Sequence, residues 1–334
     1  MFINRRLFLK TGGAAVAGGI ILPPFMQSCQ NNQISLDVKS YLDHFEVSTE
    51  MLNKVIREAM GKGGDYADLF FEHKTSNSLG LEDGKVNRAS SNIDYGVGIR
   101  VLKGDQTGFA YSETISLYAM LNAAKLASNI ANSSKTYSEV PFTEKVPASF
   151  YLIDKKWEDV SVKDKVPFVQ KINEKVFSLD KKVTKVNAYY GDETSLVLFF
   201  SSEGKLTYDY RPMVTLGVVC IMEKDGKLEN AYAARSFRKG FEFLNDDLID
   251  LLSREVVDKT NILFEATKPK AGEMPVVMGA GGSGILLHEA IGHTFEADFN
   301  RKGTSIFSDK MGKKWQKALL TSLTMEPCQI TAAQ

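Results

Sequence analysis

Two of the chain's four histidines, His288 and His293, lie five positions apart, and Glu289 directly follows the first of them. Two imidazole nitrogens can bind a borderline metal ion such as zinc, and a carboxylate next to them can act as a base. These three residue types in this order therefore point to metal-assisted hydrolysis. The same spacing also fits a plainer arrangement, in which one histidine lies on a helix surface and the other caps the helix end.

The spacing of the two histidines constrains the helix that carries them. In the better-known H-E-x-x-H arrangement the histidines are four apart and share one helix face. Five residues correspond to about 500° of rotation, so on a straight helix His288 and His293 would point about 140° apart. Binding of one ion requires the helix to bend, to contain a π-bulge or to end between them, and Gly292 is where a break costs least.

The elements expected around the motif would hold the histidines rigidly. An apolar run, Met274–Met278, predicts a strand, the glycine-rich stretch 279–284 predicts a turn, and a helix is expected to begin there. A helix that starts after such a turn leaves backbone N–H groups free at its first residues. This arrangement favours a functional site over a surface histidine and a helix cap.

At this level of detail the sequence resembles a known family. Leu287-His288-Glu289-Ala290-Ile291-Gly292-His293, followed by residues 295–301 and 303–305, closely resembles the metal motif of the TldD/PmbA zinc metallopeptidases. The resemblance extends from about Met51 to Lys314. It implies that His288 and His293 are zinc ligands and that Glu289 is the catalytic glutamate. Because PmbA-type members lack the motif, the chain is similar to the TldD-like branch.

The resemblance also implies a fold, a substrate class and partners. The expected fold class is α+β, with an N-terminal α/β domain of antiparallel meander strands followed by the start of a mostly β C-terminal metallopeptidase domain that is cut short. Family members hydrolyse unfolded or short peptides inside a closed dimeric chamber, so a homodimer or a heterodimer with a PmbA-like subunit is expected. Their third zinc ligand is a cysteine further along, and Cys328 does not stand in a similar context.

The last residues depart from the family pattern. Residues 315–334 match none of it, but when they are back-translated and read one nucleotide earlier they can encode a typical family continuation. We therefore expect a frameshift near Lys314, natural or a sequencing error, and an out-of-frame tail over 315–334. Because the third ligand would be lost with the missing domain, we expect the chain as given to be weakly active or inactive as a peptidase.

The N-terminus predicts export. Arg5 and Arg6 match the twin-arginine signal pattern, and a Gly/Ala-rich apolar segment follows them, too short and glycine-rich to indicate a membrane span. Cys29 then stands where a lipoprotein signal would have its lipidated cysteine. Two outcomes stay open: a lipid-anchored envelope protein, or cleavage nearby and a soluble periplasmic protein. Residues 1–28 are therefore expected to be the signal and 29–47 a tether.

Composition is consistent with a globular export protein. The 334 residues are 43% hydrophobic, enough for a sizeable core and two domains, which we place at 48–270 and 271–314. Lysine plus arginine and aspartate plus glutamate both number 41, and this balance predicts no nucleic-acid partner. Three widely spaced cysteines make no disulfide framework.

Periodicity and turn residues predict the secondary structure of the first domain. Ser48 is expected to cap a helix over Met51–Met60, and Thr114 a second helix with an apolar stripe that includes Leu126. Asp-Gly pairs at 83–84 and 225–226 predict hairpin turns. A meander of antiparallel strands is expected over 183–237 and a helix over 246–264. His44 and His73 are expected to be surface residues.

Two functions of other classes compete with the peptidase. One is a non-catalytic exported lipoprotein of the same fold that acts as a partner or binds peptides. Absence of zinc from the purified protein would favour it. The other is a DNA-associated regulator, against which the net charge of zero and the export signal both argue.

Overall fold

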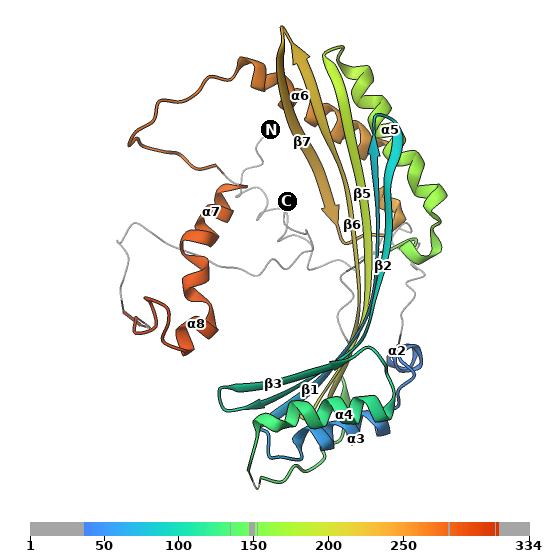
Figure 1. The fold of residues 1–334 in the computed structure, drawn as a ribbon, viewed down its shortest axis with the longest axis vertical. Helices are drawn as coiled ribbons and strands as arrows, with labels where there is room; N and C mark the ends of the chain where they lie inside the picture. Colours follow the sequence, from blue (N-terminus) through green and yellow to red (C-terminus); the bar gives the residue numbers. More distant parts are fainter. Residues whose placement is uncertain are drawn as a thin grey trace, which may run out of the picture. The chain divides into compact units, whose positions relative to one another are not determined.

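The computed structural model describes residues 37–133, 135–146, 151, 153–279, 281–310 and 312–313, and it shows a mixed α+β fold built on one large sheet (Figure 1). The strands are β1 (Tyr66–Glu82), β2 (Lys85–Lys103), β3 (Gln106–Ser112), β4 (Thr143–Glu144), β5 (Val183–Ser201), β6 (Lys205–Lys224) and β7 (Lys227–Phe237). The helices are α2 (Val38–His44), α3 (Thr49–Met60), α4 (Leu117–Ala127), α5 (Val162–Leu179), α6 (Asp246–Glu265), α7 (Ser283–Ala290) and α8 (Ala297–Arg301). None of the helices in the described residues is long and apolar enough to cross a membrane.

The sheet is antiparallel throughout except at its shortest strand. Its order is β3-β2-β1-β5-β6-β4, β7 also pairs with β6, and only the short β4–β6 pairing is parallel. The predicted meander over 183–237 is confirmed as β5, β6 and β7. Before the Asp225-Gly226 turn the meander consists of the two long strands β5 and β6.

Both predicted Asp-Gly turns are present. Asp83 and Gly84 join β1 to β2 with φ of 46° and 78°, and Asp225 and Gly226 join β6 to β7 with φ of 53° and 77°. Two successive positive φ angles define the two-residue turn whose twist matches that of antiparallel strands. Because aspartate and glycine tolerate positive φ better than other residues do, this dipeptide is a reliable sequence signal for these hairpins.

The helices cover one face of the sheet in two groups. On β1, Leu69 and Phe71 are buried in a core with α3 and α4, whereas Leu79 and Leu81 are buried in a second core with α5 and α6. Side chains an even number of positions apart on a strand point to the same face, so both helix pairs cover the same face of β1. Figure 1 shows the two helix pairs at opposite ends of the long strands. Each fully buried leucine or phenylalanine stabilises its core by about 1.5–3 kcal/mol.

Helix α4 begins two residues later than the sequence suggested. Ser116, not Thr114, is the cap, since its hydroxyl accepts a hydrogen bond from the N–H of Ala119 at 3.2 Å. The expected apolar stripe is also wrong in part, because Leu126 is 64% exposed. Small residues face the sheet instead because the helix end approaches β3 closely: a Cβ at Gly108 would lie 2.0 Å from the carbonyl oxygen of Ala127.

The N-terminal part of the described chain is folded where a tether was expected. Residues 29–47 were assigned to the tether, yet Val38–His44 is helix α2. Tyr41 and Phe45, four apart on one helix face, are 2% and 0% exposed and pack into the core of α3 and α4. Because the residues around Tyr41 and Phe45 are mostly polar, the sequence did not predict this helix.

Two other predictions about elements turned out differently. Met274–Met278 is not a strand, and its apolar side chains are exposed, with Val277 at 98%. A strand needs a partner to satisfy its backbone groups, and the described residues supply none to this segment. Cys220, expected to be a small core residue, is confirmed as fully buried, and burial raises the pKa of its thiol to about 11.

Candidate metal centre

The helix that carries the metal motif ends between the two histidines. Helix α7 stops at Ala290, Ile291 leaves the helical region with φ −130° and ψ −42°, and a 3₁₀ turn, η5, runs over Gly292–Phe295. The break that the five-residue spacing requires is therefore present, one residue before the glycine. On a straight helix His288 and His293 would point in different directions, and the break removes this separation.

The break brings the three motif side chains together. The ligand atoms of His288, Glu289 and His293 all lie within 4.8 Å of one another. The two imidazole rings are 4.4 Å apart between centroids and are inclined by 61°. His293 Nε2 lies 3.5 Å from a carboxylate oxygen of Glu289. All three side chains are exposed, so they are accessible to an ion and to water.

Gly292 leaves space for the first histidine. A Cβ at this position would lie 3.0 Å from Nδ1 of His288, closer than a side-chain carbon normally approaches. The φ of Gly292 is not in the left-handed region, so the conformation of the backbone does not demand glycine here. The position of the His288 ring is what favours glycine at 292.

Glu296 is a residue of the site to which the sequence assigned no role. One of its carboxylate oxygens lies 2.7 Å from Nδ1 of His293. This hydrogen bond and the charge of Glu296 raise the pKa of His293 above its usual value. A carboxylate on one ring nitrogen fixes the ring orientation and directs the other nitrogen to a metal ion. The signal was present in the sequence, since Glu296 follows His293 by three residues.

The three side chains could hold a metal ion. Catalytic zinc sites typically use three protein ligands and keep a further position open for water or substrate. His288 and His293 offer two imidazole nitrogens of the kind such sites use, and the Glu289 carboxylate lies beside them, exposed to solvent. The other sequence-predicted residues, Arg5, Arg6 and Cys29, lie outside the described residues, as does Cys328.

The two remaining histidines form a separate pair. His44 on α2 and His73 on β1 lie 2.8 Å apart between Nε2 and Nδ1, with their rings stacked. They were expected to be independent surface residues, and the sequence gives no sign of their pairing because 29 positions separate them. Burial and the neighbouring His73 lower the pKa of His44.

Three domain profiles of one family match the chain in order. They are described as PmbA/TldA metallopeptidase domain 1 over residues 67–131, the central domain over 155–264, and the C-terminal domain over 271–327. The chain belongs to the PmbA/TldD metallopeptidase family. The third match contains the His288–His293 motif and continues past Lys314.

Curated relatives agree with the family assignment, and a solved structure has the same fold. A metalloprotease TldD homologue from Haemophilus influenzae is 33% identical over 297 residues, which cover 87% of this chain and 61% of the relative. A metalloprotease TldD homologue from Buchnera aphidicola subsp. Acyrthosiphon pisum is 34% identical over 295 residues, which cover 83% of this chain and 61% of the relative. TldE from Thermococcus kodakarensis has the same fold, with a TM-score of 0.59 at 15% identity over 78% of this chain and 58% of that one.

The chain thus spans about three fifths of the length of these relatives. The relatives are named metalloproteases, and a more distant one from Saccharolobus solfataricus, 24% identical over 75% of this chain and 55% of its own, is named a zinc metalloprotease. These names describe the relatives as metal-dependent proteases. The predicted family and α+β fold class are therefore confirmed.

Proposed function

We propose that this chain carries the zinc centre of an exported metallopeptidase that hydrolyses unfolded or short peptides. The observation that supports it most is the convergence of His288, Glu289 and His293 within 4.8 Å, inside the segment that matches the family's C-terminal domain. A further carboxylate, that of Glu296, hydrogen-bonds to His293.

Each residue has a defined role in this proposal. His288 and His293 hold the ion, and Glu296 orients His293 through its Nδ1. When bound, zinc supplies Lewis-acid chemistry that polarises a peptide carbonyl and makes water more acidic. Glu289 accepts the proton of the attacking water and returns it to the leaving amine, a transfer that a positioned carboxylate accelerates by about 10²–10⁴-fold.

Zinc binding by the purified chain tests the assignment of these residues. Titration against a chromophoric chelator should give one bound zinc per chain. Loss of a residue that hydrogen-bonds to a metal ligand typically weakens metal binding by about 10- to 100-fold. His288→Ala and His293→Ala each remove a ligand itself, so each should weaken zinc binding by more than this. Glu289→Gln should retain zinc and remove whatever hydrolysis of a quenched peptide the chain shows. Equal zinc affinity in all variants would contradict the proposal.

Peptidase activity is proposed for the assembled protein. Its active assembly would be a homodimer or a heterodimer with a PmbA-like subunit. If the chain bound peptides but neither zinc nor a partner, the non-catalytic lipoprotein would be the better account.

The proposed site of action is the periplasm or cell envelope. It rests on the twin-arginine pattern at Arg5 and Arg6 and on Cys29 just after the apolar segment. Replacement of both arginines by lysine should retain the precursor in the cytoplasm. Cys29→Ser should release the processed protein from membranes if the cysteine is lipidated, and should change nothing if the protein is cleaved and soluble.

A further inference from the structure

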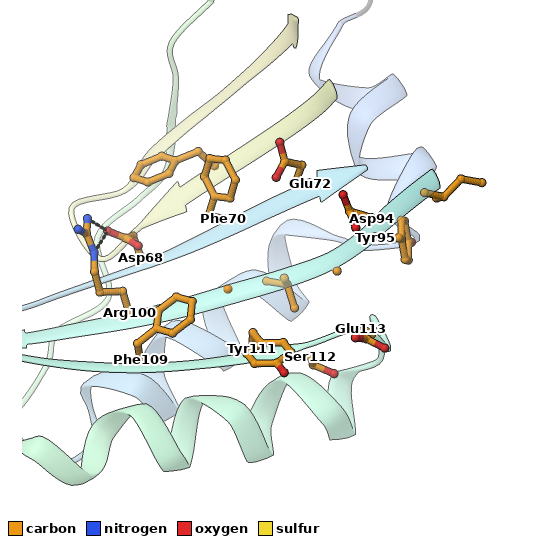
Figure 2. Close-up of a pocket in the computed structure, with 15 residues that line it drawn as sticks. Asp68, Phe70, Glu72, Asp94, Tyr95, Arg100, Phe109, Tyr111, Ser112 and Glu113 are labelled. Carbon is orange, nitrogen blue, oxygen red and sulfur yellow. Dashed lines mark hydrogen bonds and ion pairs between the residues drawn. The ribbon is translucent and has the colours of Figure 1, made fainter. Parts of the chain in front are cut away.

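The face of the sheet that the helices leave uncovered contains a groove of about 850 Å³ (Figure 2). Residues of β1, β2, β3 and β5 line it. Gly96 and Gly98 of β2 form part of its floor, and a Cβ at Gly98 would lie 3.1 Å from the Phe109 ring. Glycine at this position therefore lets the Phe109 ring lie against the sheet.

Exposed aromatic side chains line the groove. Phe70 pairs with Phe199 across β1 and β5, and Tyr111 of β3 pairs with Gly98 of β2. Phe109 and Tyr111 are 63% and 70% exposed, and Phe70 is 36% exposed. Clustered exposed aromatic surface of this kind marks an interaction site more often than it marks an ordinary protein surface.

The charged residues of the groove are mostly acidic. Figure 2 shows Glu72, Asp94 and Glu113 toward one end of it and the Asp68–Arg100 pair at the other. Arg100 donates to Asp68 at 3.0 Å, so its charge is already compensated.

A nearby lysine compensates only part of the acidic end. Lys74 of β1 lies 2.8 Å from Glu193, and Glu72 and Asp94 also raise its pKa. Glu72 in turn accepts a hydrogen bond from the Ser195 hydroxyl at 2.6 Å. The lining residues therefore keep an excess of negative charge beside aromatic rings.

We infer that this groove binds an extended peptide segment that carries lysine or arginine side chains. A cation over an aromatic ring is attracted by the electrons of the ring face, and a cleft lined by one sign of charge concentrates ligands of the other sign. This binding does not depend on the metal centre, so it goes beyond the proposed catalytic function and stands or falls separately.

Fluorescence anisotropy with the intact chain in EDTA tests the inference. The probe is a fluorescein-labelled ten-residue glycine-serine peptide with two arginines, compared with the same peptide carrying two glutamates. The arginine peptide should bind at least tenfold more tightly, and raising the salt from 50 to 300 mM should weaken its binding because exposed charges are screened. Equal binding of the two peptides would overturn the inference.

Two double variants locate the binding. Asp94→Asn with Glu113→Gln, and Phe109→Ala with Tyr111→Ala, should each weaken binding of the arginine peptide at least tenfold while melting curves remain those of a folded chain. The control is Glu58→Gln with Glu174→Gln, the same change of charge at exposed positions on helices α3 and α5. A loss of affinity in the control equal to that in the groove variants, or no loss in either groove variant, would refute the site.

Discussion

At the scale of single residues, Gly292 shows how closely the motif is fitted. The helix ends at Ala290, and the missing side chain at 292 leaves the ring of His288 its position beside His293. The sequence indicated Gly292 for the ease of a backbone break. The structure adds that the side-chain space above it is already occupied, which no spacing rule could reveal.

Gly292→Ala should therefore weaken zinc binding without unfolding the chain. The added carbon would lie 3.0 Å from His288 Nδ1, so the ring must shift by a few tenths of an ångström. Since metal sites tolerate little displacement of their ligands, we expect a loss of about 3- to 30-fold in zinc affinity, measured by chelator competition. Gly284→Ala on helix α7 is the control, because a Cβ there meets nothing within 4 Å. Equal effects of the two variants would contradict this account of Gly292.

The His44–His73 pair makes stability depend on pH. The pKa of His44 is lowered in the fold, so below about pH 6.5 the unfolded chain takes up a proton that the folded chain does not. Stability should thus be complete above that pH and fall as the pH drops toward the folded pKa. The melting temperature should decrease between pH 7.5 and 5.5, and His73→Gln should make that decrease smaller. An unchanged decrease in His73→Gln would show that the pair is not responsible.

At the scale of elements, a buried ion pair joins helix α5 to strand β5. Lys165 Nζ lies 2.7 Å from an Asp192 oxygen, and the two side chains are 3% and 1% exposed. Asn77 of β1 donates to the other oxygen at 2.9 Å, and the Tyr190 hydroxyl donates to Asp192 as well. The carboxylate is thus fully satisfied, and it is satisfied only while α5 is in place.

Lys165→Met should destabilise the chain by about 3–5 kcal/mol, because it leaves a buried carboxylate without its counter-charge. Lys165→Met combined with Asp192→Asn should recover at least about 1.5 kcal/mol of this loss, since the amide oxygen still accepts from Tyr190 and carries no charge. Urea unfolding of both variants measures the difference. A double variant less stable than the single one would show that the charge itself is not what destabilises it.

At this scale, the sequence predicted correctly those elements that depend on local residue patterns. Ser48, the Asp-Gly turns and helix α6 depend on residues within a few positions, and all are confirmed. The cap of α4, the folding of α2 and the lack of a strand at Met274–Met278 depend on distant packing partners. So does Glu296 in part: its spacing from His293 was visible, but its contact with Nδ1 requires the 3₁₀ turn that follows the helix break.

At the scale of the whole molecule, the described residues include two exposed surfaces rich in apolar or aromatic side chains. One face of the sheet lacks a helix layer in the described residues, and it contains the acidic aromatic groove. The segment around Val277 and helix α7 is exposed and apolar, with Ile285, Leu286 and Leu287 at 52–62%. Exposed apolar and aromatic surface of this kind marks sites of interaction.

The measurement that tests the central claim most directly is the zinc content and affinity of the purified chain. One zinc per chain, lost in His288→Ala and in His293→Ala but kept in Glu289→Gln and in the groove variant Asp94→Asn with Glu113→Gln, is the result that the account predicts. No bound zinc in the unaltered chain, or zinc that survives loss of either histidine, would contradict it.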